Sequence, residues 1–174
     1  GSAPAFLSDF EGIFVALPEA RVDLTGGTIT ATGDVTLTAD AVANVTTAPS
    51  TIVDSIDTSV VVVLPNANIT LDNTTLSAEN LSATATVNAT VTFEDQADGD
   101  DDEETQDAAV TAVVLIGDAT TAVQGTSALS VSGDVALAAA STLNLTSTTD
   151  GSGGTAGATL AVTEVQMHTA AYVT

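Results

Sequence analysis

The chain has 174 residues, of which one is basic and 23 are acidic, and its net charge is −22. Because Arg21 is its only Lys or Arg, it offers phosphates almost no cations, so we expect neither nucleic-acid binding nor membrane insertion. It has no Cys, and hence no disulfide or thiolate chemistry, and no apolar run near the roughly 18 residues of a membrane span.

The first recognisable element is Ile13-Phe-Val-Ala-Leu-Pro-Glu-Ala-Arg-Val-Asp-Leu24. It is followed by Gly27-Thr-Ile-Thr-Ala-Thr-Gly-Asp-Val-Thr-Leu-Thr-Ala39, in which apolar residues alternate with Thr or Asp. Alternation with a period of two predicts β-strands that bury one face. Gly33 lies between two such strands, and because Gly tolerates left-handed backbone it predicts a corner.

Further copies follow in the same frame. Val60–Leu71 matches the first element, with its Leu-Pro 47 residues later, and Thr74–Ala85 matches the second with one residue fewer. Ala109–Val123 and Ser127–Ala139 form a third copy, and Ala161–Val173 opens a fourth. The corner position is taken by Gly33, Asn80 and Gly133, and the equivalent apolar positions are Ile29, Leu76 and Leu129; Ala31, Ala78 and Val131; Val35, Leu81 and Val135; and Leu37, Ala83 and Leu137.

These copies divide the chain. We expect one β segment over residues 3–174, made of repeats at about 12–58, 59–107 and 108–160 and the start of a fourth at 161–174, with residues 1–2 left over from cloning. Three stretches between the copies vary in length and composition, at roughly 47–57, 94–107 and 148–158. Variable insertions at one point of a repeat predict loops on one face of a stack.

A single repeat, with four or five short strands, cannot bury both sides of its apolar stripe, whereas stacked copies can. The pattern predicts a right-handed parallel β-helix (a β-solenoid), in which each repeat supplies about two coils and the handedness follows the crossover rule. The alternative is an antiparallel β-sandwich, which also has many short strands with turn signals. The uneven spacings of 47 and 53 residues, from Ile29 to Leu76 and from Leu76 to Leu129, keep that alternative open.

The third copy also carries a family resemblance. It reads Ala-Val-x-x-Val-Val, then Ala-Thr-Thr-Ala-Val, then Leu-x-Val-x-Gly-Asp-Val-x-Leu-x-Ala, and ends in a Ser/Thr tract. This order resembles the repeats of giant filamentous-haemagglutinin-like exoproteins and adhesins, over residues 12–173. The resemblance implies a right-handed parallel β-helix, export and a surface role, and it supplies no catalytic residues. The near absence of Lys and the acidic insert depart from the family pattern.

The acidic run between Glu94 and Asp107 is the strongest local feature. Calcium prefers several carboxylate oxygens on a flexible loop. The candidate calcium ligands are Asp95, Asp98, Asp100 and Asp102. The run lacks the ligand order of an EF-hand and the Gly-Gly-x-Gly-x-Asp repeat of calcium-binding β-rolls, so a solvated loop without a specific metal is the alternative.

Other polar residues have weaker functional interpretations. Recurring Thr-x-Thr pairs could bind ice, but outward Thr on strands explains them more simply. His168 and Tyr172, each the only residue of its kind, are expected on a strand face, and Arg21 is expected to pair with Glu19 or Asp23. Six asparagines begin Asn-x-Ser/Thr triplets and are candidate glycosylation sites: Asn44, Asn68, Asn73, Asn80, Asn88 and Asn144.

We expect no enzyme. Some β-helix proteins cleave acidic polysaccharides, but they need cations beside their catalytic carboxylates to hold the anionic sugar, and this chain has a single Arg. Asp34 and Asp134 lie at repeat-equivalent corners, where a role in the turn explains them. The sequence favours a structural repeat segment of a large secreted or cell-surface adhesin or fibre, acting as a rigid spacer with decorated loops. Its partners would be the other repeats of the same chain and a cell-surface glycan or protein, in an extracellular setting. The alternative is a calcium- or glycan-binding module that uses the 94–107 loop.

Overall fold

A computed structural model describes residues 12–47, 56–96, 108–150 and 158–174, and these ranges contain strands and no helix. None of them therefore supplies a helix long and apolar enough to cross a membrane. The strands are β1 (Gly12–Ala16), β2 (Glu19–Thr30), β3 (Val35–Thr47), β4 (Ile56–Val63), β5 (Asn66–Ala78), β6 (Leu81–Gln96), β7 (Ala108–Gln124), β8 (Ala128–Val131), β9 (Val135–Asp150) and β10 (Ala158–Val173).

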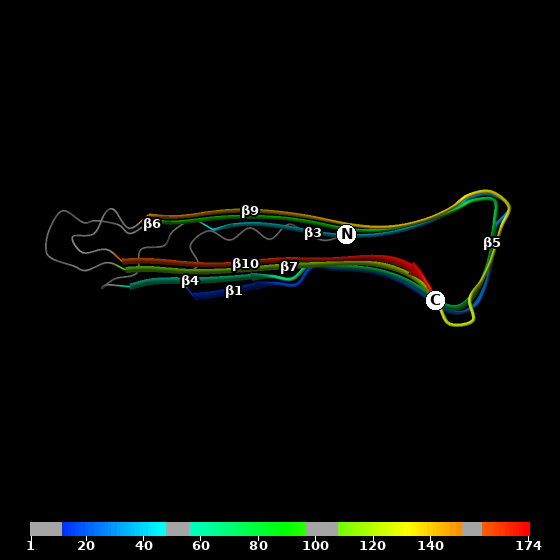
Figure 1. Cartoon of the computed structure of the whole chain (residues 1–174), viewed down its shortest axis with the longest axis horizontal. Helices are drawn as coiled ribbons and strands as arrows, with labels where there is room; N and C mark the ends of the chain where they lie inside the picture. The colour runs from blue at the N-terminus through cyan, green and yellow to red at the C-terminus, as the bar shows by residue number, and fades with distance from the viewer. Residues whose placement is uncertain (1–11, 48–55, 97–107, 151–157) are drawn as a thin grey trace, which may run out of the picture.

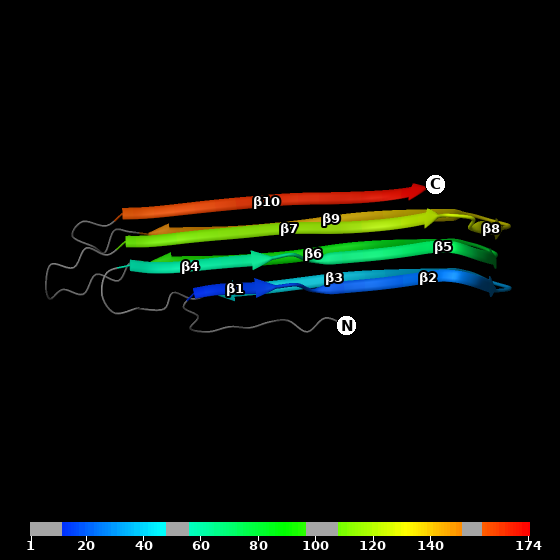
Figure 2. The same ribbon diagram turned by 90° about the horizontal axis from the view of Figure 1, so that it is seen from below.

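The strands form two sheets that face each other (Figure 1). The first sheet has the order β1-β4-β7-β5-β2, with β10 paired to the far side of β7 and β8 paired to β5. The second sheet has the order β3-β6-β9. Each repeat runs along the first sheet, crosses at one end of the molecule and returns along the second sheet. We call this circuit a coil, and Figure 2 shows the successive coils stacked edge to edge.

Every strand pairing in the described part of the chain is parallel. The expected equivalences are confirmed, since Ile29 pairs with Leu76 and Leu76 with Leu129, and the Val35, Leu81 and Val135 positions pair in the same way. The antiparallel sandwich is wrong, because copies that lie beside one another in the same direction leave no antiparallel ladder.

The expectation of about two coils per repeat is also wrong, because each repeat makes one coil. Ile13 pairs directly with Val60, and Val60 with Ala112, so the neighbour of a strand is the equivalent strand of the next repeat. The strands are long rather than short, and β7 alone has 17 residues. The alternation of apolar and polar residues continues through segments that look like separate short strands in the sequence. Each long side of a coil is therefore a nearly continuous extended chain.

The core lies between the sheets and is built from small side chains in columns. Ala39, Ala85 and Ala139 form one column, and the middle member is completely buried. Burial depends on the position of the coil in the stack. Leu76 of the middle coil is 0% exposed, whereas Ile29 and Leu129 in the flanking coils are only partly buried. A coil therefore completes its core only when it has neighbours on both sides.

Each coil has two corners, and the sequence predicts only one of them. The predicted corner exists at Gly33, Asn80 and Gly133, but none of these residues has the left-handed backbone expected for it. Left-handed residues instead make the other corner, where Asn73 has a φ of 53° and Gly125 a φ of 67°. At Gly133 the reason for glycine is space, because an added Cβ would lie 3.0 Å from the carbonyl oxygen of Glu79.

Candidate functional site

The candidate calcium ligands fall almost wholly outside the described residues. Asp95 lies near the end of strand β6, of which only the backbone is described there, and Asp98, Asp100 and Asp102 lie in the segment between β6 and β7. In the ranges that are described, no three His, Cys, Asp or Glu side chains come together to hold a metal. The calcium site therefore stays a prediction.

One corner carries a polar ladder that connects the three coils. The Asn80 side chain donates from Nδ2 to Asp34 Oδ1 at 2.7 Å, and its Oδ1 accepts the backbone N–H of Asp134 at 2.8 Å. Backbone bonds continue the ladder, from Glu79 N–H to the Gly33 carbonyl and from Gly133 N–H to the Glu79 carbonyl. The Asn80 side chain joins the coils here, Asp34 contributes its carboxylate and Asp134 its backbone N–H, so both aspartates lie in the turn that the repeat pattern predicts.

The second corner uses the same chemistry with different residues. Asn73 Oδ1 accepts two hydrogen bonds from Thr126, one from its backbone N–H at 3.0 Å and one from its hydroxyl at 2.9 Å. The Thr74 hydroxyl donates to the Leu24 carbonyl at 2.9 Å, and the Ser127 hydroxyl to the Gln124 carbonyl at 2.7 Å. Side chains thus satisfy the backbone groups that the turn removes from the ladders.

The three singular residues lie on the outer faces of strands. His168 and Tyr172 are on β10, as predicted, and His168 Nδ1 lies 3.5 Å from Asp118 Oδ1 on β7. Of the two partners predicted for Arg21, the structure pairs it with Asp23. Both pairs are largely exposed, so each contributes little to stability.

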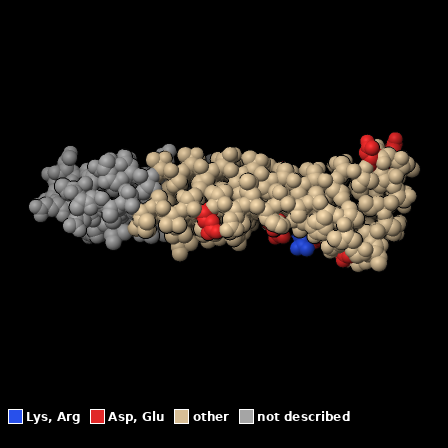
Figure 3. Space-filling view, viewed as in Figure 1, with Lys and Arg blue, Asp and Glu red and all other residues tan. Residues whose placement is uncertain are grey.

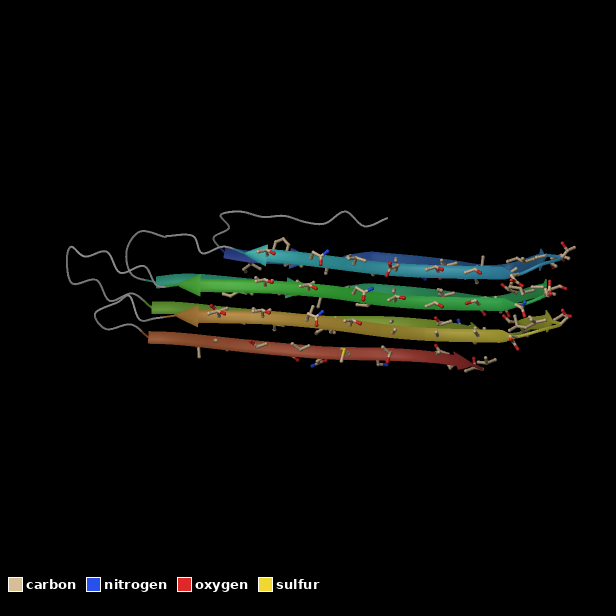
Figure 4. All side chains as sticks on the ribbon, turned by 90° about the horizontal axis from the view of Figure 1, so that it is seen from above. Atoms are coloured by element: carbon tan, nitrogen blue, oxygen red, sulfur yellow. The ribbon has the colours of Figure 1, made fainter. Side chains whose placement is uncertain are left out.

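The candidate glycosylation sites divide into two groups. Asn73 and Asn80 are held in the corners, and Asn68 Oδ1 accepts a hydrogen bond from the Thr70 hydroxyl. Asn44, Asn88 and Asn144 are exposed on the outer face of the second sheet. Figure 4 looks onto this face, where short oxygen- and nitrogen-bearing side chains follow the strands.

The Thr residues of that face do not form a uniform array across the coils. Thr38 pairs with Thr84 and Thr84 with Ala138, so this column loses its hydroxyl in the third coil. Ice binding needs a flat, regular Thr lattice, and the register here supports the simpler interpretation of outward Thr on strands.

A large apolar surface on the first sheet is absent from the sequence predictions. At the start of each coil, apolar side chains occupy the outer face as well as the inner one, and Ile13 and Leu17 are 66% and 64% exposed. We call this surface the apolar patch, and its members are Ile13, Val15, Leu17, Val60, Val62, Leu64, Val114, Ile116 and Val162. The signal in the sequence is the unbroken run Val60–Leu64, because apolar residues without alternation predict a strand with two apolar faces.

Two hollows open at the first coil, and a third, of about 300 Å³, lies across three coils at the corner that holds Asp34, Asn80 and Asp134. One, of about 370 Å³, is lined by residues that include Phe14 and Val45, and another, of about 620 Å³, by residues that include Ala20 and Ala39. The two at the first coil lie between the sheets at the end of the stack, where no further coil of the described chain closes the core. They are openings of the core, and neither gathers a nucleophile with a base.

No protein-family model, curated protein or solved structure matches this chain.

Proposed function

We propose that this chain is a structural repeat segment of a large secreted or cell-surface adhesin or fibre, folded as a right-handed parallel β-helix. The observation that carries the proposal is the in-register stacking of equivalent residues, such as Ile29, Leu76 and Leu129, over successive repeats. Repetition of this kind builds a scaffold, because each coil presents the next with a matching ladder and a matching core column.

The path of the chain supports a right-handed winding. In Figure 1 the chain runs along the first sheet, crosses at the end that holds the corners and returns along the second sheet, in a counterclockwise direction. The later repeats lie nearer the viewer, and Figure 2 shows the same order from β1 to β10. A counterclockwise path that approaches the viewer is right-handed, which is the usual sense of parallel crossovers.

The dimensions favour a broad wall over a long spacer. Adjacent coils are about 4.8 Å apart, so about 50 residues of chain add only that much length along the stack. Strand β7, with 17 residues, spans about 56 Å across it. The repeats therefore make a wide, flat blade with two extended faces, and the function follows from those faces and from the segments attached to them.

The described strands end and begin again at one end of the blade. β3, β6 and β9 end where β4, β7 and β10 begin, at the end of the coils opposite to the corners (Figure 1). Insertions can vary there without disturbing the ladders. The acidic segment between β6 and β7 is the one with a distinctive chemistry.

Two measurements test the proposal. Single-molecule pulling on the termini should unfold the chain in steps of one repeat, each releasing about 165–190 Å of chain at about 3.5 Å per residue. A single low-force event that releases the whole chain would contradict a scaffold role, because it would show that the coils do not resist load separately.

The second measurement is calorimetric titration with calcium and a glycan array. It compares the chain with a variant whose residues 97–107 are replaced by a Gly-Ser linker of equal length, and with a control variant in which residues 151–157 are replaced. The scaffold proposal expects no calcium-specific heat and a blank array for all three. Heat or glycan binding that is lost only in the 97–107 replacement would instead establish a binding module.

A further inference from the structure

Three of the six Asn-x-Ser/Thr triplets come together on the outer face of the second sheet. They begin at Asn44 on β3, Asn88 on β6 and Asn144 on β9, so each of three successive coils supplies one. In the register, Asn44 pairs with Thr90 of the Asn88 triplet, and Thr90 pairs with Asn144. Neighbouring strands are about 4.8 Å apart, so the Cα atoms of Asn44 and Asn144 are about 10 Å apart, with the Asn88 triplet between them.

The strands present each triplet in the same orientation. Residues two apart on a strand point to the same face, so the asparagine and the Thr that closes the triplet both point outward, while the residue between them points into the core. Burial agrees with this geometry, since Val45 and Ala89 are buried and Leu145 is partly buried. The polar members are all exposed: Asn44, Thr46, Asn88, Thr90, Asn144 and Thr146. The two groups that define a sugar acceptor, the Asn amide and the hydroxyl, therefore both remain in solvent.

The face around these triplets is polar and nearly uncharged. Among the described outward side chains of β3, β6 and β9, Asp40 is the only charged one. Residues 135–148 of β9 include no charged residue, and in Figure 3 the upper border, which β9 forms, shows acidic atoms only at the corner. A neutral polar surface suits a sugar chain, because sugar hydroxyls exchange hydrogen bonds with Thr, Ser and Asn side chains.

The asparagines of the other three triplets are held by the fold. The amide nitrogen, to which a sugar would be attached, donates to Asp34 Oδ1 at 2.7 Å in Asn80 and to Asp72 Oδ1 at 3.0 Å in Asn73. A sugar at Asn80 would have to fit between neighbouring coils, where even a Cβ at position 133 would clash with the Asn80 side chain. Asn68 is half-buried on the first sheet and accepts a hydrogen bond from the hydroxyl of its own triplet.

The three asparagines of the outer face keep their amide nitrogens accessible. In the described part of the chain, Asn44 and Asn144 make no side-chain hydrogen bond. The Asn88 nitrogen makes only a 3.4 Å contact with Asp40 Oδ1, which is longer than an ordinary hydrogen bond. A sugar on any of these three nitrogens therefore leaves the ladders, the corners and the core as they are.

We propose that Asn44, Asn88 and Asn144 carry N-linked sugar chains, which together cover the outer face of the second sheet. The donor is a lipid-linked oligosaccharide. The amide nitrogen bonds to the anomeric carbon of the sugar as the bond from that carbon to a phosphate oxygen breaks; the amide loses one proton, and the lipid phosphate leaves with the electron pair. The proposal rests on the proposed function, because such donors reach a chain on its route of export.

The first test maps the modification on the whole chain isolated from the cells that produce it. Thermolysin digests the chain, because trypsin would find no Lys and a single Arg. Mass spectrometry should find sugar on the peptides with Asn44, Asn88 and Asn144 at least about tenfold more often than on the peptides with Asn73 and Asn80. Bare peptides at the three outer positions, or equal sugar at the corners, would overturn the proposal.

Cell fractionation separates this proposal from the proposed function. A chain recovered from the cell surface or the medium without sugar overturns the glycosylation sites and leaves the fibre proposal intact. A chain that stays inside the cell overturns the proposed export, and the glycosylation sites with it.

Two matched variants test the triplets themselves. The first removes the three hydroxyls that close the triplets and keeps every asparagine: Thr46→Ala, Thr90→Ala and Thr146→Ala. The control removes three hydroxyls that lie on the same face and belong to no triplet: Thr36→Ala, Thr84→Ala and Thr142→Ala. Only the first variant should lose its sugar mass, and far-UV circular dichroism should show an intact fold for both, because all six side chains point outward. Sugar retained by the first variant, or lost from both, would refute the assignment.

Discussion

The stacking of coils makes burial, and hence stability, depend on position within a single column of equivalent residues. Leu76 belongs to the column that also contains Ile29 and Leu129. Of these three residues, only Leu76 lies in a coil that has a complete coil on each side. Substitution of Leu76 by Ala should therefore destabilise the chain more than the same change at Leu129, although the two leucines occupy equivalent positions of the repeat.

The magnitude follows from burial. Leu76 is 0% exposed, and Leu→Ala removes three carbons, which is worth about 2.4 kcal/mol at about 0.8 kcal/mol per buried carbon. The cavity that remains adds to this loss, for a total of about 3–4 kcal/mol. Leu129 is partly exposed before substitution, so it loses less transfer free energy and leaves a space open to water, and we expect about half that cost.

Urea unfolding followed by far-UV circular dichroism measures both variants, since the chain has no Trp and only one Tyr. Leu76→Ala should lower the unfolding midpoint about twice as far as Leu129→Ala with an unchanged slope. Equal losses, or a larger loss at Leu129, would refute the conclusion that the middle coil completes its core through both neighbours.

Three further predictions follow from the corners and the charge. Asn73→Ala removes two hydrogen bonds from Thr126 and replaces Asn, which tolerates left-handed backbone, by Ala, which tolerates it less, so it should cost about 2–4 kcal/mol, whereas Asn73→Gly should cost about 1–2 kcal/mol; equal urea midpoints would contradict this. Gly117→Ala should cost about 1–2 kcal/mol, because its Cβ meets side-chain atoms of Leu143 and Val87, which can shift. Gly133→Ala should cost more, because its Cβ meets a backbone carbonyl, and the reverse order of thermal midpoints would contradict the corner geometry. Raising NaCl from 0.05 to 0.5 M should raise the thermal midpoint, because the chain has 23 acidic groups and one basic group, and the added salt shortens the Debye length from about 14 to about 4 Å and so screens their repulsion; a falling midpoint would contradict it.

Much of the fold can be predicted from the sequence, because repeats with a period-two pattern determine both strand character and register. The pairing of Val35 with Leu81 and Val135 follows directly from the aligned copies, including the residue missing at Asn80. The number of coils per repeat does not follow, because alternation alone does not show where a strand bends. Pro18 and Pro65 suggest turns, yet the chain continues along the same sheet, and Asn66 N–H still bonds to the Pro18 carbonyl.

The second corner could have been found by the same alignment. Gly26, Asn73 and Gly125 are 47 and 52 residues apart, which are the spacings that the structure uses between coils. Residues that tolerate left-handed backbone at equivalent positions predict a turn.

The central claim, that each repeat forms one coil in parallel register with the next, is tested most directly by cysteine pairs in this Cys-free chain. Thr90 of β6 pairs with Asn144 of β9, and both are exposed on the outer face. Neighbouring strands are about 4.8 Å apart, within the roughly 4.4–6.8 Å that a disulfide spans. The double variant Thr90→Cys and Asn144→Cys should form an intramolecular disulfide under mild oxidation, whereas Thr90→Cys with Thr142→Cys should not. Failure of the first pair, or equal oxidation of the two, would contradict the one-coil repeat.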